Sequence, residues 1–127
     1  MSATVARLWF LVQAVLVSAW WLLLACSPAA RSLFVVGDWP EATLLLYAPA
    51  DMFALVVPSL VAGAGLRRRV FWAGAAAMFT CGAAVYAFLT TVGALLATGN
   101  GWLPSAIMLP CAVGNVLAAR AATRTPT

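Results

Sequence analysis

Four long apolar stretches make up most of this chain and leave few ways for it to fold. They cover about residues 8–27, 39–66, 70–97 and 102–119. A helix rises ~1.5 Å per residue, so each stretch is long enough to cross all or most of the roughly 30 Å hydrocarbon core of a bilayer. The sequence therefore predicts an all-α integral membrane protein in which residues 1–127 form a single four-span transmembrane domain.

The composition fits a membrane protein and leaves little room for enzyme chemistry. Hydrophobic residues make up 65% of the chain and charged residues 8%, whereas soluble domains are roughly 45–50% apolar. There is no histidine and the three cysteines are far apart in the sequence, so the usual metal, haem and paired-thiol sites lack ligands. The chain also lacks a nucleophile with a base or two matched carboxylates. We therefore expect no metal, no cofactor and no catalytic activity.

Arginines concentrate at alternate ends of the predicted spans. Three follow the second span and most of the others lie near the chain termini, whereas Arg31 lies in the first connection with Asp38 and Glu41 to offset it. The positive-inside rule then places both termini in the cytoplasm, which predicts an antiparallel, up-down-up-down four-helix bundle with N-in/C-in topology. The absence of lysine favours a bacterial inner (cytoplasmic) membrane. The arginines on the predicted inner side are Arg7, Arg67, Arg68, Arg69, Arg120 and Arg124.

The second span should begin near Trp39 and bend along its length. Asp38 has the position of an N-cap, and Glu41 follows at the spacing of a capping box. Pro49 and Pro58 lie within the span, and each removes one backbone hydrogen bond. These prolines predict bends, which membrane bundles tolerate when neighbouring groups satisfy the freed carbonyls.

Cys26 leaves an alternative open for the first span. The sequence from Leu23 to Cys26 follows an arginine and an apolar run, as in a bacterial lipoprotein signal whose cysteine is lipidated. We favour an unmodified thiol at the outer edge of the first span, because the three later spans already anchor the chain.

Small side chains predict the packing face of the third span. Alanines and threonines recur there at alternating three- and four-residue spacing, which lets another helix approach closely. Bulkier residues, among them Met78 and Val85, fall on the opposite side and should face lipid. In the first and fourth spans, Gln13 and Asn115 reach the same depth, so we expect them to bond across the bundle. The predicted small seam is Ala73, Ala76, Thr80, Ala83, Ala87, Thr90 and Ala94.

Asp51 is the only acidic residue well inside an apolar stretch. A charge in hydrocarbon is costly, so a carboxylate at this depth faces a protein interior or a water pocket and is a candidate functional group. Burial favours the neutral acid, which can donate one hydrogen bond, and we expect Tyr47 or Tyr86 to receive it. Trp20 or Trp21 and Cys111 reach a similar depth. The candidate ligand-binding residues are therefore Asp51, Tyr47, Tyr86, Trp20, Trp21 and Cys111.

These features predict a non-enzymatic membrane module that binds a partner helix or an apolar ligand. Its expected partners are the lipid bilayer, another membrane protein or a second copy of the chain, and an apolar small molecule, but not nucleic acid. The alternative is a small carrier or channel in which Asp51 binds a proton or a cation. Transport normally requires a polar path or an inverted repeat, and the sequence shows no convincing internal similarity.

Overall fold

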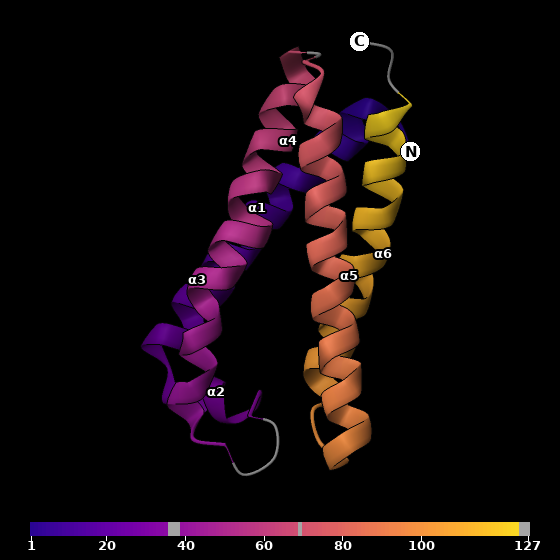
Figure 1. Ribbon diagram of the computed structural model, residues 1–127. Coiled ribbons are helices and arrows are strands. Elements are labelled where there is room, and N and C mark those ends of the chain that lie inside the picture. Colours follow the sequence, from indigo (N-terminus) through magenta and orange to yellow (C-terminus); the bar gives the residue numbers. More distant parts are fainter. Residues whose placement is uncertain (36–38, 69, 125–127) are drawn as a thin grey trace.

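Four long helices form the structure, as the apolar stretches predict (Figure 1). The computed structural model describes residues 1–35, 39–68 and 70–124, which are helical with short connections and contain no β-strand. The prediction of an all-α chain with four long apolar helices is confirmed. Each helix is long and apolar enough to cross a membrane, and the four are Ala3–Cys26, Glu41–Arg68, Trp72–Thr98 and Trp102–Thr123.

The first and last helices extend further than the apolar stretches indicate. Helix α1 (Ala3–Cys26) begins before Arg7, because Ser2 is its N-cap and accepts a hydrogen bond from the backbone N–H of Val5 at 3.3 Å. Helix α6 (Trp102–Thr123) continues past Arg120, because the alanines around that arginine are strong helix formers.

A short helix, α2 (Pro28–Ser32), follows α1 and closes its end. The hydroxyl oxygen of Ser27 accepts a hydrogen bond from the N–H of Ala30 at 3.1 Å, and proline occupies the first turn. The Arg31 guanidinium donates to the Leu24 carbonyl at 2.6 Å, so it satisfies one of the carbonyls left open at the end of α1. The predicted N-cap Asp38 lies outside the described residues.

The second long helix is irregular around Asp51. It begins as a 3₁₀ helix, η1 (Glu41–Tyr47), continues as α3 (Ala48–Asp51), widens into a π-turn, η2 (Met52–Val56), and ends as α4 (Val57–Arg68). The N–H of Val57 bonds to the carbonyl of Met52, five residues back. Pro58 has no N–H to continue the α-helical pattern, so the wider turn lies where that pattern would fail. The predicted bends are therefore changes of helix type.

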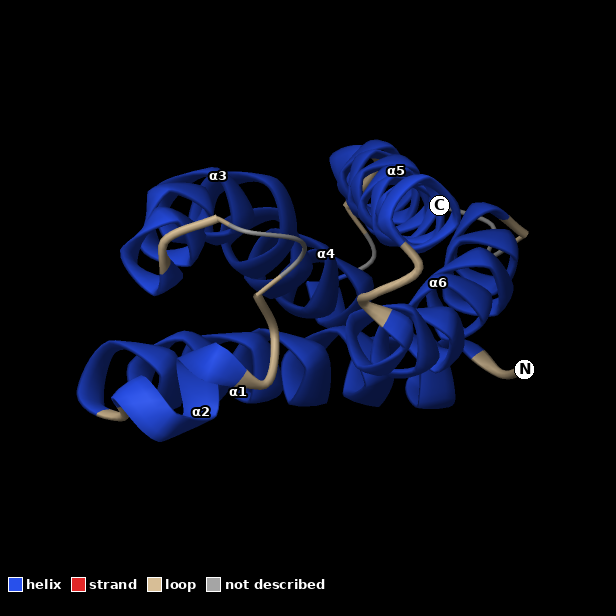
Figure 2. Cartoon of the chain, turned by 90° about the horizontal axis from the view of Figure 1, so that it is seen from below, coloured by secondary structure: helices blue, strands red, loops and turns tan. Residues whose placement is uncertain are grey.

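The long helices pack side by side, each against two neighbours (Figures 1 and 2). Helix α1 contacts α4 and α6, and α5 (Trp72–Thr98) also contacts α4 and α6. Figure 1 shows the N-terminus, the end of α6 and the connection from α4 to α5 at one end of the molecule. Helix α2 and the connection from α5 to α6 lie at the other end.

The buried core consists mostly of small side chains near the chain termini, and it is aromatic at the opposite end. Phe10 is fully buried among alanines that come from each of the long helices. At the other end, Trp21 and Leu24 of α1 pack with Phe34. Small residues let the helix backbones approach closely, so the helices gain dispersion contacts with one another. Such contacts stabilise helix packing in lipid, where the hydrophobic effect does not drive helices together. The buried alanines around Phe10 are Ala6, Ala62, Ala77, Ala118, Ala119 and Ala122.

The packing face of α5 lies partly off the predicted seam. Ala73 and Thr80 are buried as predicted, but Ala77 and Ala84 are the other buried residues of this helix. The reason is that α5 packs between α4 and α6, so its buried line lies between two contact faces rather than on one. The remaining predicted seam residues Ala76, Ala83, Ala87 and Ala94 are half-buried, and Thr90 is exposed. Met78 faces outward as predicted, whereas Val85 is half-buried.

Candidate functional site

Asp51 is the last residue of α3, directly before the π-turn, and its side chain is half-buried. The indole N–H of Trp21 in α1 donates to Asp51 Oδ2 at 3.1 Å. Within the part of the chain that the structure describes, the other carboxylate oxygen, Oδ1, accepts no hydrogen bond. Asp51 therefore joins the first and second long helices through one oxygen and keeps a second acceptor.

The two tyrosines expected on Asp51 lie elsewhere, so that expectation is wrong. Tyr47 is 48% exposed and Tyr86 is 73% exposed. Among the described residues, no hydrogen bond joins Tyr47 to Asp51, whose bonded partner is Trp21. Tyr86 lies two residues after buried Ala84, about 200° around α5, and so falls on the far face.

The adjacent tryptophans of α1 have separate contacts. Trp21 is buried and holds the carboxylate of Asp51. Trp20 packs edge-on against Phe34, with ring centroids 4.4 Å apart and an angle of 86° between the planes. Neighbouring residues on a helix differ by about 100° in direction, so only one of them faces Asp51. The aromatic packing of Trp20 contributes to the position of α1 near α2, and the indole of Trp21 provides the polar contact.

Cys111 belongs to a second polar group, the amide cluster, which consists of Gln13, Ser59, Cys111 and Asn115. The Asn115 side-chain amide donates to Gln13 Oε1, and the Gln13 amide donates to the hydroxyl oxygen of Ser59 at 3.1 Å. The predicted bond between Gln13 and Asn115 is confirmed. The cluster also extends to α4, because Ser59 lies there. Three long helices are therefore joined in the centre of the bundle.

The Cys111 thiol sits against the amide cluster and makes no hydrogen bond with Asp51 among the described residues. Its sulfur lies 3.8 Å from Gln13 Oε1, which is the distance of a weak thiol donor. Its backbone carbonyl accepts from the Asn115 amide at 2.8 Å. Asn115 is fully buried, and its own oxygen, Oδ1, has no hydrogen-bond partner in the described part of the chain.

Ser59 is a further residue of the bundle interior, and the sequence carries a signal for it that was not among the predictions. Ser59 is the only hydroxyl residue between Asp51 and Arg67, and it lies eight residues after Asp51. Eight residues is a little over two helical turns, so Ser59 shares a face with Asp51. It is fully buried. A lone hydroxyl near the face of the one carboxylate inside this span could have been assigned to the bundle interior.

The chemistry available to these groups is acceptance of hydrogen bonds and attraction of a cation. Comparison of the chain with protein-family models, with curated proteins and with solved structures finds no match. Four helices of the described chain are long and apolar enough to cross a membrane, which indicates a multi-pass membrane protein. Asp51 and Trp21 form its candidate binding site, and the amide cluster lies deeper in the bundle.

Proposed function

We propose that the chain is a non-enzymatic protein of a bacterial inner membrane that binds a partner helix or an apolar ligand at Asp51. In this proposal the four helices alternate in direction and both termini are cytoplasmic. The arginines near the chain ends and after the second span support that orientation, because positive charge concentrates on the cytoplasmic side. The position of the N-terminus and the end of α6 at one end of the molecule supports it as well (Figure 1).

The topology is testable with reporter fusions. Fluorescent-protein fusions after Arg68 and at the C-terminus should fluoresce, because both sites are cytoplasmic in the proposal. Alkaline phosphatase fused after Arg31 or Asn100 should be active, because both sites are then outside. An active phosphatase fused after Arg68 would contradict the proposed orientation.

The observation that carries the binding proposal is the half-used carboxylate of Asp51. Trp21 occupies Oδ2, and no donor in the described residues reaches Oδ1. An unsatisfied acceptor in an apolar environment is costly, so a ligand with one donor group gains free energy when it supplies that donor. Partly buried apolar side chains that pack against the cluster of Trp21, Leu24 and Phe34 provide the rest of the surface, and they include Ala48 and Met52.

Substitutions at Asp51 test this proposal with an apolar amine as the probe. The dye N-phenyl-1-naphthylamine should bind the detergent-solubilised chain. Asp51→Asn keeps the shape and one carbonyl oxygen, whose second lone pair can accept the ligand's donor beside the Trp21 indole. Its affinity should therefore stay within about threefold of wild type, a difference below 1 kcal/mol. Asp51→Leu removes the acceptor and should weaken binding about tenfold, which corresponds to ~1.4 kcal/mol. Dye fluorescence during titration gives both affinities.

Ala50→Leu is the matched control for Asp51→Leu. Ala50 is exposed on the same turn, so this change adds the same apolar bulk but leaves the carboxylate in place. Its affinity for the dye should equal that of wild type. Equal weakening by the two leucine substitutions would mean that bulk, rather than the lost acceptor, is responsible, and the proposed role of Asp51 would be wrong.

The second candidate function is a small proton- or cation-coupled carrier or channel, and two observations favour it. The second long helix changes type next to Asp51, and broken helices are where transporters place their ion sites. The spare oxygen of buried Asn115 gives the bundle interior a further acceptor. Liposome flux separates the two functions, because pH-dependent uptake that disappears in Asp51→Asn would establish the carrier and overturn the binding module.

A further inference from the structure

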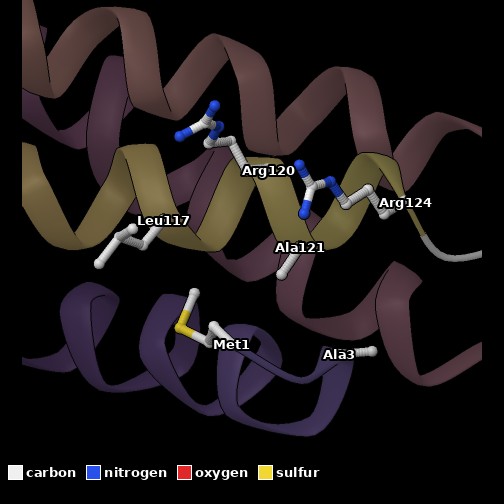
Figure 3. Close-up of a pocket in the computed structure, with 6 residues that line it drawn as sticks. All are labelled: Met1, Ala3, Leu117, Arg120, Ala121 and Arg124. Atoms are coloured by element: carbon white, nitrogen blue, oxygen red, sulfur yellow. The ribbon is translucent and has the colours of Figure 1, made fainter.

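A pocket opens between the start of α1 and the last turns of α6 (Figure 3). Its volume is about 370 Å³, within the usual range for a small-molecule site. In Figure 3, Met1 and Leu117 point into the space between the two helices, and two arginines extend from α6 beside it. The pocket is lined by Met1, Ala3, Leu117, Arg120, Ala121 and Arg124.

The two arginines of this pocket have no anion within the described chain. Arg120 and Arg124 lie four residues apart on one face of α6, and both are exposed. Like charges at this spacing repel each other. Neither guanidinium makes a hydrogen bond or an ion pair with the described residues. All three acidic residues of the sequence precede residue 52. Glu41 begins the second long helix, and that helix ends at Arg68, near the end of α6, so Glu41 lies a full helix length from the two arginines. An anion from outside the chain would relieve this repulsion.

The depth of the pocket matches the headgroup region of a bilayer. A rise of ~1.5 Å per residue puts Arg120 roughly 27 Å along α6 from Trp102. This is close to the roughly 30 Å thickness of the hydrocarbon core. Arg120 and Arg124 therefore lie at the height of lipid phosphates, while Leu117 lies nearly one turn deeper, at the height of the upper acyl chains. The pocket lining is thus cationic at the height of the lipid headgroups and apolar at the height of the acyl chains, so it complements an anionic phospholipid at both levels.

We propose that this pocket binds the phosphate of an anionic phospholipid from the leaflet around this end of the bundle. The guanidinium groups of Arg120 and Arg124 hold the phosphate oxygens, whose geometry their forked donors match. Met1 and Leu117 contact the glycerol and the first carbons of the acyl chains. This inference does not depend on the proposed ligand site at Asp51, which lies in the second long helix and involves neither arginine.

The test compares two lipids with matched acyl chains on the full chain in detergent. Native mass spectrometry should show that short-chain phosphatidylglycerol binds at least tenfold more tightly than short-chain phosphatidylcholine. Arg120→Gln with Arg124→Gln should remove this preference, with a loss of roughly fivefold for each arginine and roughly 25-fold for the pair. The matched control is Arg67→Gln with Arg68→Gln, which removes the same charge from the end of α4 and should keep the preference.

Three results would overturn the inference. The first is equal binding of the two lipids by wild type. The second is an equal loss in the α4 control, which would mean that diffuse surface charge attracts the lipid. The third is displacement of phosphatidylglycerol by an equal concentration of inorganic phosphate, which would identify a free-anion site. The single variants Arg120→Gln and Arg124→Gln should each lose roughly fivefold in affinity for phosphatidylglycerol, so the test still decides if the double variant fails to fold.

Discussion

Replacing Gly114 with leucine should lower the free energy of unfolding by about 3 kcal/mol. Gly114 lies in α6 against the indole ring of Trp9 in α1, and a Cβ at this position would overlap the ring atoms Cζ2, Cη2 and Cε2. The ring cannot yield without separating α1 from α6, because Trp9 also packs against the buried core around Phe10. Reversible unfolding in mixed detergent micelles, followed by tryptophan fluorescence, measures the loss.

Gly82→Leu is the control for this effect. Gly82 lies in α5, and a Cβ at this position would meet no atom of another described helix within 4 Å. The same substitution there should leave the stability unchanged or raise it slightly, because leucine favours a helix more than glycine does. If both leucine variants lost the same stability, the cost would come from the helix itself, and the close approach of α6 to Trp9 would not explain it.

Depth along the spans could be predicted from the sequence because helix rise is regular. The arginines and tryptophans mark the span ends, so counting residues inward places side chains on different helices at one level. The equal depth of Gln13 and Asn115 predicted the bond between them, which the structure confirms. It also assigned Asp51 and a tryptophan of α1 to one level, and Trp21 donates to Asp51.

The side of a helix from which a residue contacts the bundle was harder to predict than its depth, because it depends on which helices are neighbours. The sequence pattern of α5 has one small seam, but the helix packs against both α4 and α6, and its buried line includes Ala77 and Ala84 instead of Ala76 and Ala83. Counting residues gave Tyr86 the depth of Asp51, but Tyr86 is 73% exposed and lies on the far face of α5. Sequence periodicity indicates which side of a helix carries small residues. The positions of the neighbouring helices decide which residues on or beside that side are buried.

The change of helix type near Asp51 could not be predicted either. Pro49 and Pro58 indicate that the α-helical pattern is interrupted, but a proline does not specify how the backbone compensates. The structure uses a 3₁₀ segment before Asp51 and a π-turn after it. Each change of type rotates the residues beyond it relative to a regular helix. Contacts of the second span therefore differ from those counted on an ideal helical wheel.

Gln13→Leu should lower the free energy of unfolding by about 2 to 3 kcal/mol. Gln13 joins three helices, because it donates to Ser59 in α4 and accepts from Asn115 in α6. Hydrogen bonds between membrane helices contribute about 0.6 kcal/mol each on average, and a buried polar group left without its partner costs about 1 to 3 kcal/mol. Ser18→Ala removes another polar side chain from α1, and it should change stability by less than about 0.5 kcal/mol. The Ser18 hydroxyl donates to the Ala14 carbonyl of its own helix and bonds to no other helix in the described part of the chain.

A double-mutant cycle shows whether the amide cluster acts as one unit. Asn115→Leu removes the same interhelical bond from the other side, so the double variant should lose less stability than the two single variants together. The expected coupling is about 1 kcal/mol, since residues that share a hydrogen-bond network do not act independently. Thr123→Ala on α6 removes a hydroxyl that bonds within its own helix, and combined with Gln13→Leu it should show no coupling. Additive losses for Gln13 and Asn115 would contradict the network, because each side chain would then stabilise its own helix rather than the contact between α1 and α6.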